Sequence, residues 1–218
     1  MKPGDKVAVK GLDVTVVSSD GATLSQPLPG GGAANPLCSS FTPRDVDVSE
    51  NARSVGVVVT IGRFRMLNLG DLTWNKERDL VCPANRLGPI DVYLTTHHGL
   101  NLSGAPVLVH AVRPRVAVMN NGPRKGASRE AWLTVKNSPG LLDLWQLHTA
   151  MPRPGNPAFN ESGDSGGPEF NVPEERIANL ADQAEHTPAY ALQVSARSDG
   201  SFSVKNPRNG VSRSYPAR

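Results

Sequence analysis

The sequence predicts an α/β fold in which helices flank a mixed sheet. Strand-like and helix-like segments alternate between residues 73 and 137, and such alternation is typical of layered α/β proteins rather than of all-β barrels. The chain has 218 residues, which suits one domain with a sizeable core. Because it also contains 21 glycines and 19 prolines, we expect a single domain over residues 1–218 with long connections between its elements.

Two hairpins are predicted in the first third of the chain. Residues 13–24 alternate β-branched side chains and break at Asp20-Gly21, a turn pair typical of hairpins. Residues 54–67 hold two apolar runs around a second turn, which predicts a buried hairpin. Between them, residues 25–52 include three consecutive glycines and are expected to form a long surface loop.

The middle of the chain alternates between helices and strands. Helices are expected where apolar residues recur every three or four positions after a capping Thr or Ser, and strands where β-branched residues cluster. In chain order we expect a helix over 73–81, a strand over 90–99, a helix over 105–114, a strand over 115–122 and a helix over 128–137.

The last third begins with a second long loop. Residues 151–173 are rich in Pro, Gly and Asn, which favours irregular structure. The following stretch, PEERIANLADQAEH at residues 173–186, has the charge and spacing of a helix. Strands joined by a turn at Asp199-Gly200 are expected after it, with a last strand over residues 209–215.

Charge and composition say little about partners. The net charge is +3, so a nucleic-acid partner does not follow from charge. No stretch of eighteen apolar residues is present, so we expect no membrane segment in this chain, and its first residues lack the apolar core of a secretion signal. Cys38 and Cys82 fit either one disulfide in an exported protein or two free thiols in a cytoplasmic one.

The hexapeptide GDSGGP around Ser165 matches the nucleophile segment of chymotrypsin-like serine proteases. Ser165 would attack, with a base at His97 or His98 and a partner at Asp143. However, only about 67 residues separate His98 from Ser165, and much of that span is helix-like, whereas a second barrel needs strands there. Glu161 also stands where that family usually carries a cysteine. We interpret the hexapeptide as a coincidence within a glycine-rich loop.

A second pair of motifs lies where an α/β sheet carries its functional residues, at the carboxyl ends of strands: LNLGDL at 67–72 and YLTTHHGLNLSG at 93–104. The two carboxylate oxygens of Asp71 can be shared between two cations ~3.5–4 Å apart, and imidazole suits zinc. Adjacent side chains on a strand point to opposite faces. Only one of His97 and His98 can therefore face a metal, unless the strand breaks at Gly99.

These motifs also occur in an order that resembles a known family. Asn51 and Ser54 open the second hairpin, LGD closes it at Asp71, and HHGxxxS follows the next strand and ends at Ser103. This order is similar to the second half of a metallo-β-lactamase-fold hydrolase, in particular to the branch that resembles the hydrolase domain of bacterial DNA-uptake channels.

The resemblance implies a partial αββα fold and a metal site. Asp71 would bridge two metal ions, and one of His97 and His98 would bind a single ion. Zinc is the expected metal, with manganese or iron as alternatives. The substrate would be a phosphodiester, an ester or a lactam.

The main metal-binding motif of that family, HxHxDH, is missing, since no histidine precedes His97. Asp71 and an imidazole alone would leave two zinc ions short of the four ligands that each usually has. Two interpretations follow. The chain is either the carboxyl-terminal part of a longer metallo-hydrolase, inactive by itself, or a metal-free relative with a binding or structural role; a serine protease using Ser165 is the third and weakest hypothesis.

Overall fold

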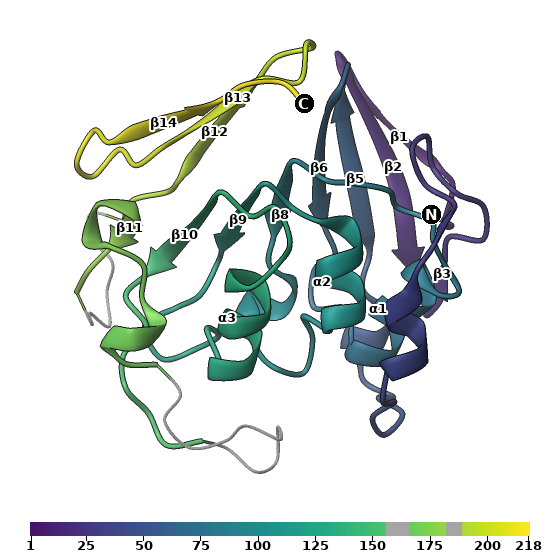
Figure 1. The fold of residues 1–218 in the computed structure, drawn as a ribbon, viewed down its shortest axis with the longest axis horizontal. Helices are drawn as coiled ribbons and strands as arrows, with labels where there is room; N and C mark the ends of the chain where they lie inside the picture. The colour runs from purple at the N-terminus through teal and green to yellow at the C-terminus, as the bar shows by residue number, and fades with distance from the viewer. Residues whose placement is uncertain (156–165, 182–188) are drawn as a thin grey trace.

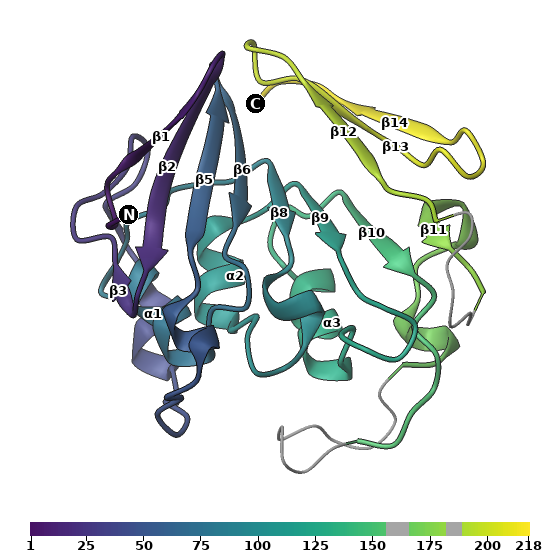
Figure 2. The ribbon, with the colours of Figure 1, turned by 180° about the vertical axis from the view of Figure 1, so that it is seen from behind.

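The computed structural model describes residues 1–155, 166–181 and 189–218. Within these ranges, three α-helices lie against one face of a nine-stranded sheet, as Figures 1 and 2 show from opposite sides. A three-stranded sheet near the carboxyl terminus packs against the other face. The predicted α/β fold, with a mixed sheet and flanking helices, is therefore confirmed.

The strands of the large sheet follow the order β1, β2, β5, β6, β8, β9, β10, β11, and β3 pairs with β2. Their bounds are β1 Lys6–Val9, β2 Leu12–Ser19, β3 Ala22–Thr23, β5 Gly56–Ile61, β6 Phe64–Asn68, β8 Val92–Leu94, β9 Val116–Met119, β10 Asp143–His148 and β11 Ile177–Asn179. The helices are α1 Trp74–Val81, α2 Pro106–Val112 and α3 Arg129–Lys136. The small sheet contains β12 Gln193–Ala196, β13 Phe202–Lys205 and β14 Ser212–Tyr215, and a separate pair joins β4 Ala33–Ala34 to β7 Ala84–Asn85.

The large sheet changes from antiparallel to parallel pairing at β6. Neighbouring strands from β1 to β6 are antiparallel, whereas β6, β8, β9, β10 and β11 run parallel to one another. The three helices form the connections between successive parallel strands from β6 to β10. Because parallel strands all point the same way, the segments that follow β6, β8, β9 and β10 meet at one edge of the sheet.

Most predicted elements lie where the sequence pattern indicated them. The first hairpin turns at Asp20 and Gly21, whose φ angles of 49° and 78° suit the tight turn of a hairpin. The second hairpin is β5 and β6, and the three helices lie within their predicted ranges. The strand expected over 90–99 is shorter than predicted, since β8 ends at Leu94 and a 3-10 turn at Thr96–Gly99 follows it.

The helix predicted over 173–186 is wrong for the part that the structure describes. After one 3-10 turn, Ile177–Asn179 forms β11, which pairs with β10 at the edge of the sheet. Ile177 and Ala178 are buried there, and the guanidinium of Arg176 lies 2.8 Å from the carboxylate of Asp143. This burial and pairing outweigh the modest helix propensity of the segment. Residues 182–186 lie outside the described ranges.

The larger core lies between the sheet and the helices. Leu67, Tyr93 and Leu144 from three parallel strands meet Leu108 of α2 and Trp132 of α3. The central parallel strand β9 is buried on both faces, which explains why its sequence, VAVM, is continuously apolar. This core fixes the strands whose carboxyl ends carry the candidate residues.

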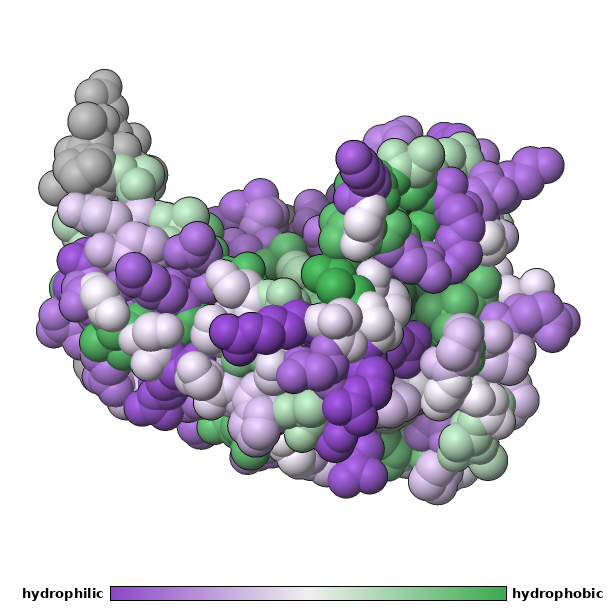
Figure 3. Space-filling model, turned by 90° about the horizontal axis from the view of Figure 1, so that it is seen from above, coloured by the Kyte–Doolittle hydropathy of each residue, from purple (hydrophilic) through white to green (hydrophobic). Residues whose placement is uncertain are grey.

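A second, smaller core joins the other face of the large sheet to the carboxyl-terminal sheet. Phe64, Val116 and Trp145 pack with Phe202 and Tyr215. The rings of Phe202 and Tyr215 stack with their centroids 4.8 Å apart. Seen from above in Figure 3, hydrophobic residues are visible in the hollow at the middle of the molecule. None of the helices in the described ranges has the length and apolar character needed to cross a membrane.

The long loop over residues 25–52 is tied to the end of α1 by a disulfide between Cys38 and Cys82. The half-buried Phe41 and Arg44 of the same loop pack on Trp74, the first residue of α1, and the Arg44 guanidinium lies 3.6 Å from its ring centroid. The loop is thus attached to both ends of α1, although it contains only short regular elements.

We expect the disulfide to contribute about 2–4 kcal/mol to stability, because it closes a loop with a sequence separation of 44 in the unfolded chain. Urea unfolding with and without reductant should show this loss, and the double variant Cys38→Ser/Cys82→Ser should unfold as the reduced protein does. A wild-type protein purified under oxidising conditions with two alkylatable thiols would contradict the prediction.

Glu77 of α1 is an unusual core residue, because its carboxyl group is fully buried beneath the loops that follow β8. One of its oxygens accepts a hydrogen bond of 2.8 Å from the Ala105 amide. Burial raises the pKa of Glu77 to about 7, although nearby amides, the Thr96 hydroxyl and Arg44 act in the opposite direction. The folded protein therefore retains this proton at pH values where the unfolded chain has lost it.

Stability should consequently fall as pH rises from about 4.5 to about 7, since the unfolded state ionises first. Glu77→Gln keeps the acceptor for Ala105 and cannot ionise. Between pH 4.5 and 8, the unfolding free energy of Glu77→Gln should rise relative to that of wild type by on the order of 3 kcal/mol. A pKa difference of one between the folded and unfolded states corresponds to about 1.4 kcal/mol. Glu50→Gln, at an exposed position, is the control, and a pH-independent difference between wild type and Glu77→Gln would refute the assignment.

Candidate metal centre

The structure brings Asp71, His97 and His98 together at the carboxyl edge of the sheet. Asn68 of β6 pairs with Leu94 of β8 in parallel register, so Asp71 and His97 each lie three residues beyond this pair. The His97 amide donates a 2.9 Å hydrogen bond to the Gly70 carbonyl, which joins the two segments. Parallel pairing therefore places the carboxylate and the imidazoles side by side.

The strand breaks before the two histidines, so both can face Asp71. His97, His98 and Gly99 have φ angles of 53°, 59° and 75°, three consecutive residues in the left-handed region. The Nε2 atom of His97 lies 3.9 Å from one oxygen of Asp71, and the Nε2 atom of His98 lies 3.7 Å from the other. Both histidines therefore face this carboxylate.

The segment that follows β9 holds this conformation in place. The Ala127 amide donates to the His98 carbonyl at 3.0 Å, and the Ser128 amide donates to the Gly99 carbonyl at 2.9 Å. Gly126 packs so closely that an added Cβ would lie 2.0 Å from the His98 carbonyl oxygen. Left-handed backbone costs roughly 1–3 kcal/mol at a residue other than glycine, so these contacts are needed to stabilise His97 and His98.

Hydrogen bonds on the far side of each ring indicate the tautomers. Ser103 donates its hydroxyl proton to the Leu72 carbonyl at 2.7 Å, and its oxygen lies 3.4 Å from His97 Nδ1, so Nδ1 is the donor in that contact. His98 Nδ1 lies 3.1 Å from the carbonyl oxygen of Asn120 and 3.4 Å from its side-chain Nδ2, and the shorter contact has Nδ1 as the donor. A neutral ring in this tautomer carries its lone pair on Nε2, the nitrogen that faces Asp71 in both histidines.

The charge state of His97 supports this assignment. Its side chain is buried, and burial lowers the pKa of His97; the carboxylates of Asp71 and Asp47 oppose this effect, whereas His98 and Lys125 add to it. The net direction is downward, so His97 is neutral at pH 7. Separations of 3.7 and 3.9 Å exceed a hydrogen bond, so neither Nε2 atom is bonded directly to the carboxylate.

The side-chain types gathered here are ones that zinc binds. Two imidazole nitrogens and a carboxylate are common zinc ligands, and an Nδ1–H that donates to a hydroxyl or a carbonyl is the usual outer partner of a metal-bound histidine. Among the residues that the structure describes, no group of three or more His, Cys, Asp or Glu side chains is arranged to hold a metal ion. Asp71, His97 and His98 also supply fewer donors than two four-coordinate ions require.

Asp143 does not lie beside His97 or His98, as the protease hypothesis requires. Asp143 is the first residue of β10 and lies in register with Val92 and Val116, at the opposite edge of the sheet from the histidines that follow β8. Its carboxylate is held by Arg213 at 2.7 Å, by Arg176 at 2.8 Å and by the Tyr215 hydroxyl at 2.7 Å. Ser165 and Glu161 lie outside the described residues. Asp143 thus stabilises the packing of the small sheet and does not orient a catalytic histidine.

Sequence reasoning missed Asn120, whose carbonyl oxygen fixes the ring of His98. The signal was present, because the turn residues NNG at 120–122 follow a predicted strand, as LGD and HHG do. It also missed Asp47 and Lys125, both of which shift the pKa of His97. No local pattern could have identified Asp47, which belongs to the long loop before the second hairpin.

Comparison with protein-family models, with curated proteins and with solved structures found no match for this chain. The candidate centre therefore rests on its residues and their geometry.

Removing the charge of Asp71 should lower the pKa of His97 further, because the carboxylate stabilises the protonated ring. NMR titration of the imidazole C–H signals in metal-free wild type and Asp71→Asn measures this change. The signal of His110, whose Nε2 contacts the Thr134 carbonyl away from Asp71, is the internal reference. A His97 pKa that rises or stays constant in Asp71→Asn would show that the two groups do not interact.

Proposed function

We propose that this chain supplies one side of the metal centre of a metal-dependent hydrolase of the metallo-β-lactamase type. Asp71 would hold metal through its carboxylate, and His97 and His98 would hold it through their imidazole nitrogens. Zinc is the proposed metal, since imidazole with carboxylate suits it, and manganese or iron would take the same donors less well.

One observation carries the proposal. Each oxygen of a single carboxylate faces a different imidazole Nε2 at 3.7 or 3.9 Å. The Nδ1 atom of each ring has its own polar partner on the far side, the Ser103 hydroxyl for His97 and the Asn120 carbonyl for His98. A carboxylate that lies between two such imidazoles is a set of donors suited to a cation.

Two bound divalent ions would polarise a substrate oxygen and lower the pKa of a bridging water toward neutrality. Several residues of the chain have positions or charge states that suit metal binding. Asp71 directs one oxygen to each imidazole, Ser103 and Asn120 orient the rings, and burial lowers the pKa of His97 so that its neutral form is favoured at pH 7. The substrate class that we propose is a phosphodiester or an ester.

The number of donors limits what this chain does alone. Three side chains are too few for two four-coordinate ions, so we propose that further ligands come from additional polypeptide and that the chain by itself is not active. The Cys38–Cys82 disulfide favours a protein that works in an oxidising compartment, because such bonds are rare where thiols are kept reduced.

The test is zinc titration of the metal-free chain by calorimetry. Wild type should show saturable binding, and Asp71→Asn, His97→Ala and His98→Ala should each weaken it by at least about tenfold, since even outer partners of ligands are worth roughly 10–100-fold. Ser103→Ala, which removes only such a partner, should fall between these variants and wild type.

His110→Ala is the matched control, because this histidine contacts α3 away from the centre. Equal zinc binding by wild type and all variants, or none by wild type, would refute the metal proposal and favour a metal-free protein with a binding or structural role. Turnover of a nitrophenyl phosphodiester by the isolated chain with tightly bound zinc would refute the claim that the centre is incomplete.

A further inference from the structure

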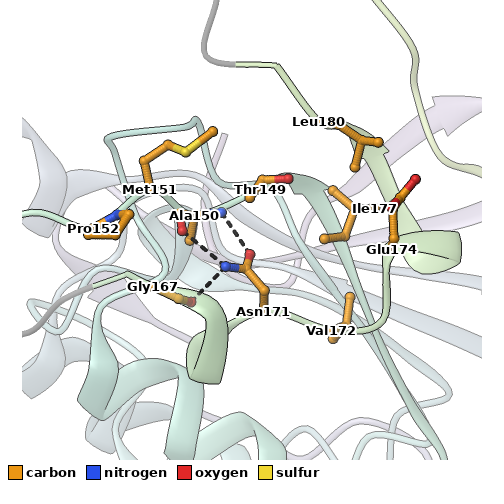
Figure 4. Close-up of a pocket in the computed structure, with 10 residues that line it drawn as sticks. All are labelled: Thr149, Ala150, Met151, Pro152, Gly167, Asn171, Val172, Glu174, Ile177 and Leu180. Atoms are coloured by element: carbon orange, nitrogen blue, oxygen red, sulfur yellow. Dashed lines mark hydrogen bonds between the residues drawn. The ribbon is translucent and has the colours of Figure 1, made fainter.

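A cavity of about 480 Å³ lies beyond the carboxyl ends of β10 and β11. Figure 4 shows Met151 and Pro152 on one side of it and Val172, Ile177 and Leu180 on the other. Its volume falls in the range of roughly 300–1,000 Å³ that is typical of small-molecule sites. The lining is mainly apolar, which restricts the chemistry of an occupant.

The polar side chain at the centre of the lining is already satisfied. Asn171 accepts from the Ala150 amide at 2.7 Å and from the Gln146 amide group at 3.1 Å. It donates to the Ala150 carbonyl at 3.0 Å and to the Gly167 carbonyl at 2.7 Å. Figure 4 shows its bonds to the residues drawn there as dashed lines. Asn171 therefore builds the wall and presents no free donor or acceptor to a ligand.

Two glycines of the GDSGGP segment have a structural role in this wall. Gly166 has a φ of 74°, and an added Cβ would lie 2.1 Å from the Met151 carbonyl oxygen. The Gly167 amide donates to the Ala150 carbonyl at 3.1 Å. The close approach of the two segments explains these glycines without any catalytic role.

Charge at the cavity is low. Among the described residues that line it, Glu174 is the one charged residue; its carboxylate is largely exposed, and Arg208 lies 3.7 Å from it. An acidic ligand would gain no cation from this lining, and a basic ligand would compete with Arg208. The cavity therefore favours an uncharged occupant.

The cavity and the candidate metal centre share a neighbouring segment. The Met151 amide donates to the Pro123 carbonyl at 2.8 Å, and Arg153 donates to the Gly126 carbonyl at 2.8 Å. Gly126 in turn packs on His98. The wall that carries Met151 is thus fixed to the same segment that holds His98 in place.

We propose that this cavity is a binding site for an uncharged aromatic or aliphatic group of a small molecule. Met151 lies on one side of the cavity and Leu180, Ile177 and Val172 lie on the other. Among the described residues of the lining, no buried polar side chain lacks a partner. A protein segment is a poorer occupant, because its backbone would bring donors and acceptors that this lining cannot satisfy.

The experiment is fluorescence titration of the full chain with Nile red, an uncharged apolar dye. Wild type should bind one dye per chain with saturation. Met151→Asp and Leu180→Asp, at half-buried positions on the two walls, should weaken binding by roughly tenfold or more, because each places a charge against the dye. Met151→Leu should retain it, and thermal unfolding should establish that the variants are folded.

Leu142→Asp is the matched control, since Leu142 is 58% exposed and lies away from this cavity. Absence of saturable binding, or equal binding by Met151→Asp, Leu180→Asp and wild type, would overturn the proposal. The titration needs no metal, so its outcome is separate from that of the zinc experiment.

Discussion

The backbone hydrogen bond between the His97 amide and the Gly70 carbonyl joins the two segments that carry the candidate ligands. It can form because β6 and β8 are adjacent parallel strands in register at Asn68 and Leu94. If these strands shifted by one residue, side chains would exchange faces, and Asp71 would no longer meet either imidazole. The register of one strand pair is thus the constraint on which the candidate centre depends.

The left-handed turn at His97 and His98 is the second requirement, and it is costly. Its cost is offset by contacts from the segment after β9, which donates amides to the His98 and Gly99 carbonyls and needs Gly126 for the close approach. Strained backbone that the surroundings hold in one conformation is characteristic of binding and catalytic sites. The same segment contacts the wall of the apolar cavity through Arg153, so the two proposed sites share their support.

The two edges of the parallel sheet have different roles. The carboxyl edge carries the candidate centre and the cavity. The opposite edge carries buried carboxylates paired with arginines: Asp143 with Arg176 and Arg213, and Asp91 with Arg115 and Arg218. These ion pairs bind strands of the large sheet to β14 and to the last residues of the chain. A buried carboxylate in this protein is therefore not by itself evidence of a functional site. The carboxylates with a structural role lie at the amino ends of the parallel strands, whereas the candidate ligand Asp71 follows a carboxyl end.

The sequence by itself determined many of the elements, although it did not predict β1 or β10 as strands. Local periodicity and turn residues were sufficient for both hairpins, for the three helices and for the placement of Asp71 and the two histidines after strands. Thr73 and Ser128 stand at the expected N-cap positions, but neither side chain makes a capping hydrogen bond. The tertiary structure alone decided how these residues are used. The left-handed break depends on Ala127 and Ser128, nearly thirty residues further along the chain, and the tautomers depend on Ser103 and Asn120. The helix-like segment at 173–186 begins with β11 because the edge of β10 was open to it. Local patterns report the conformation that a segment prefers, whereas contacts between distant segments decide which conformation it adopts and which atoms it presents.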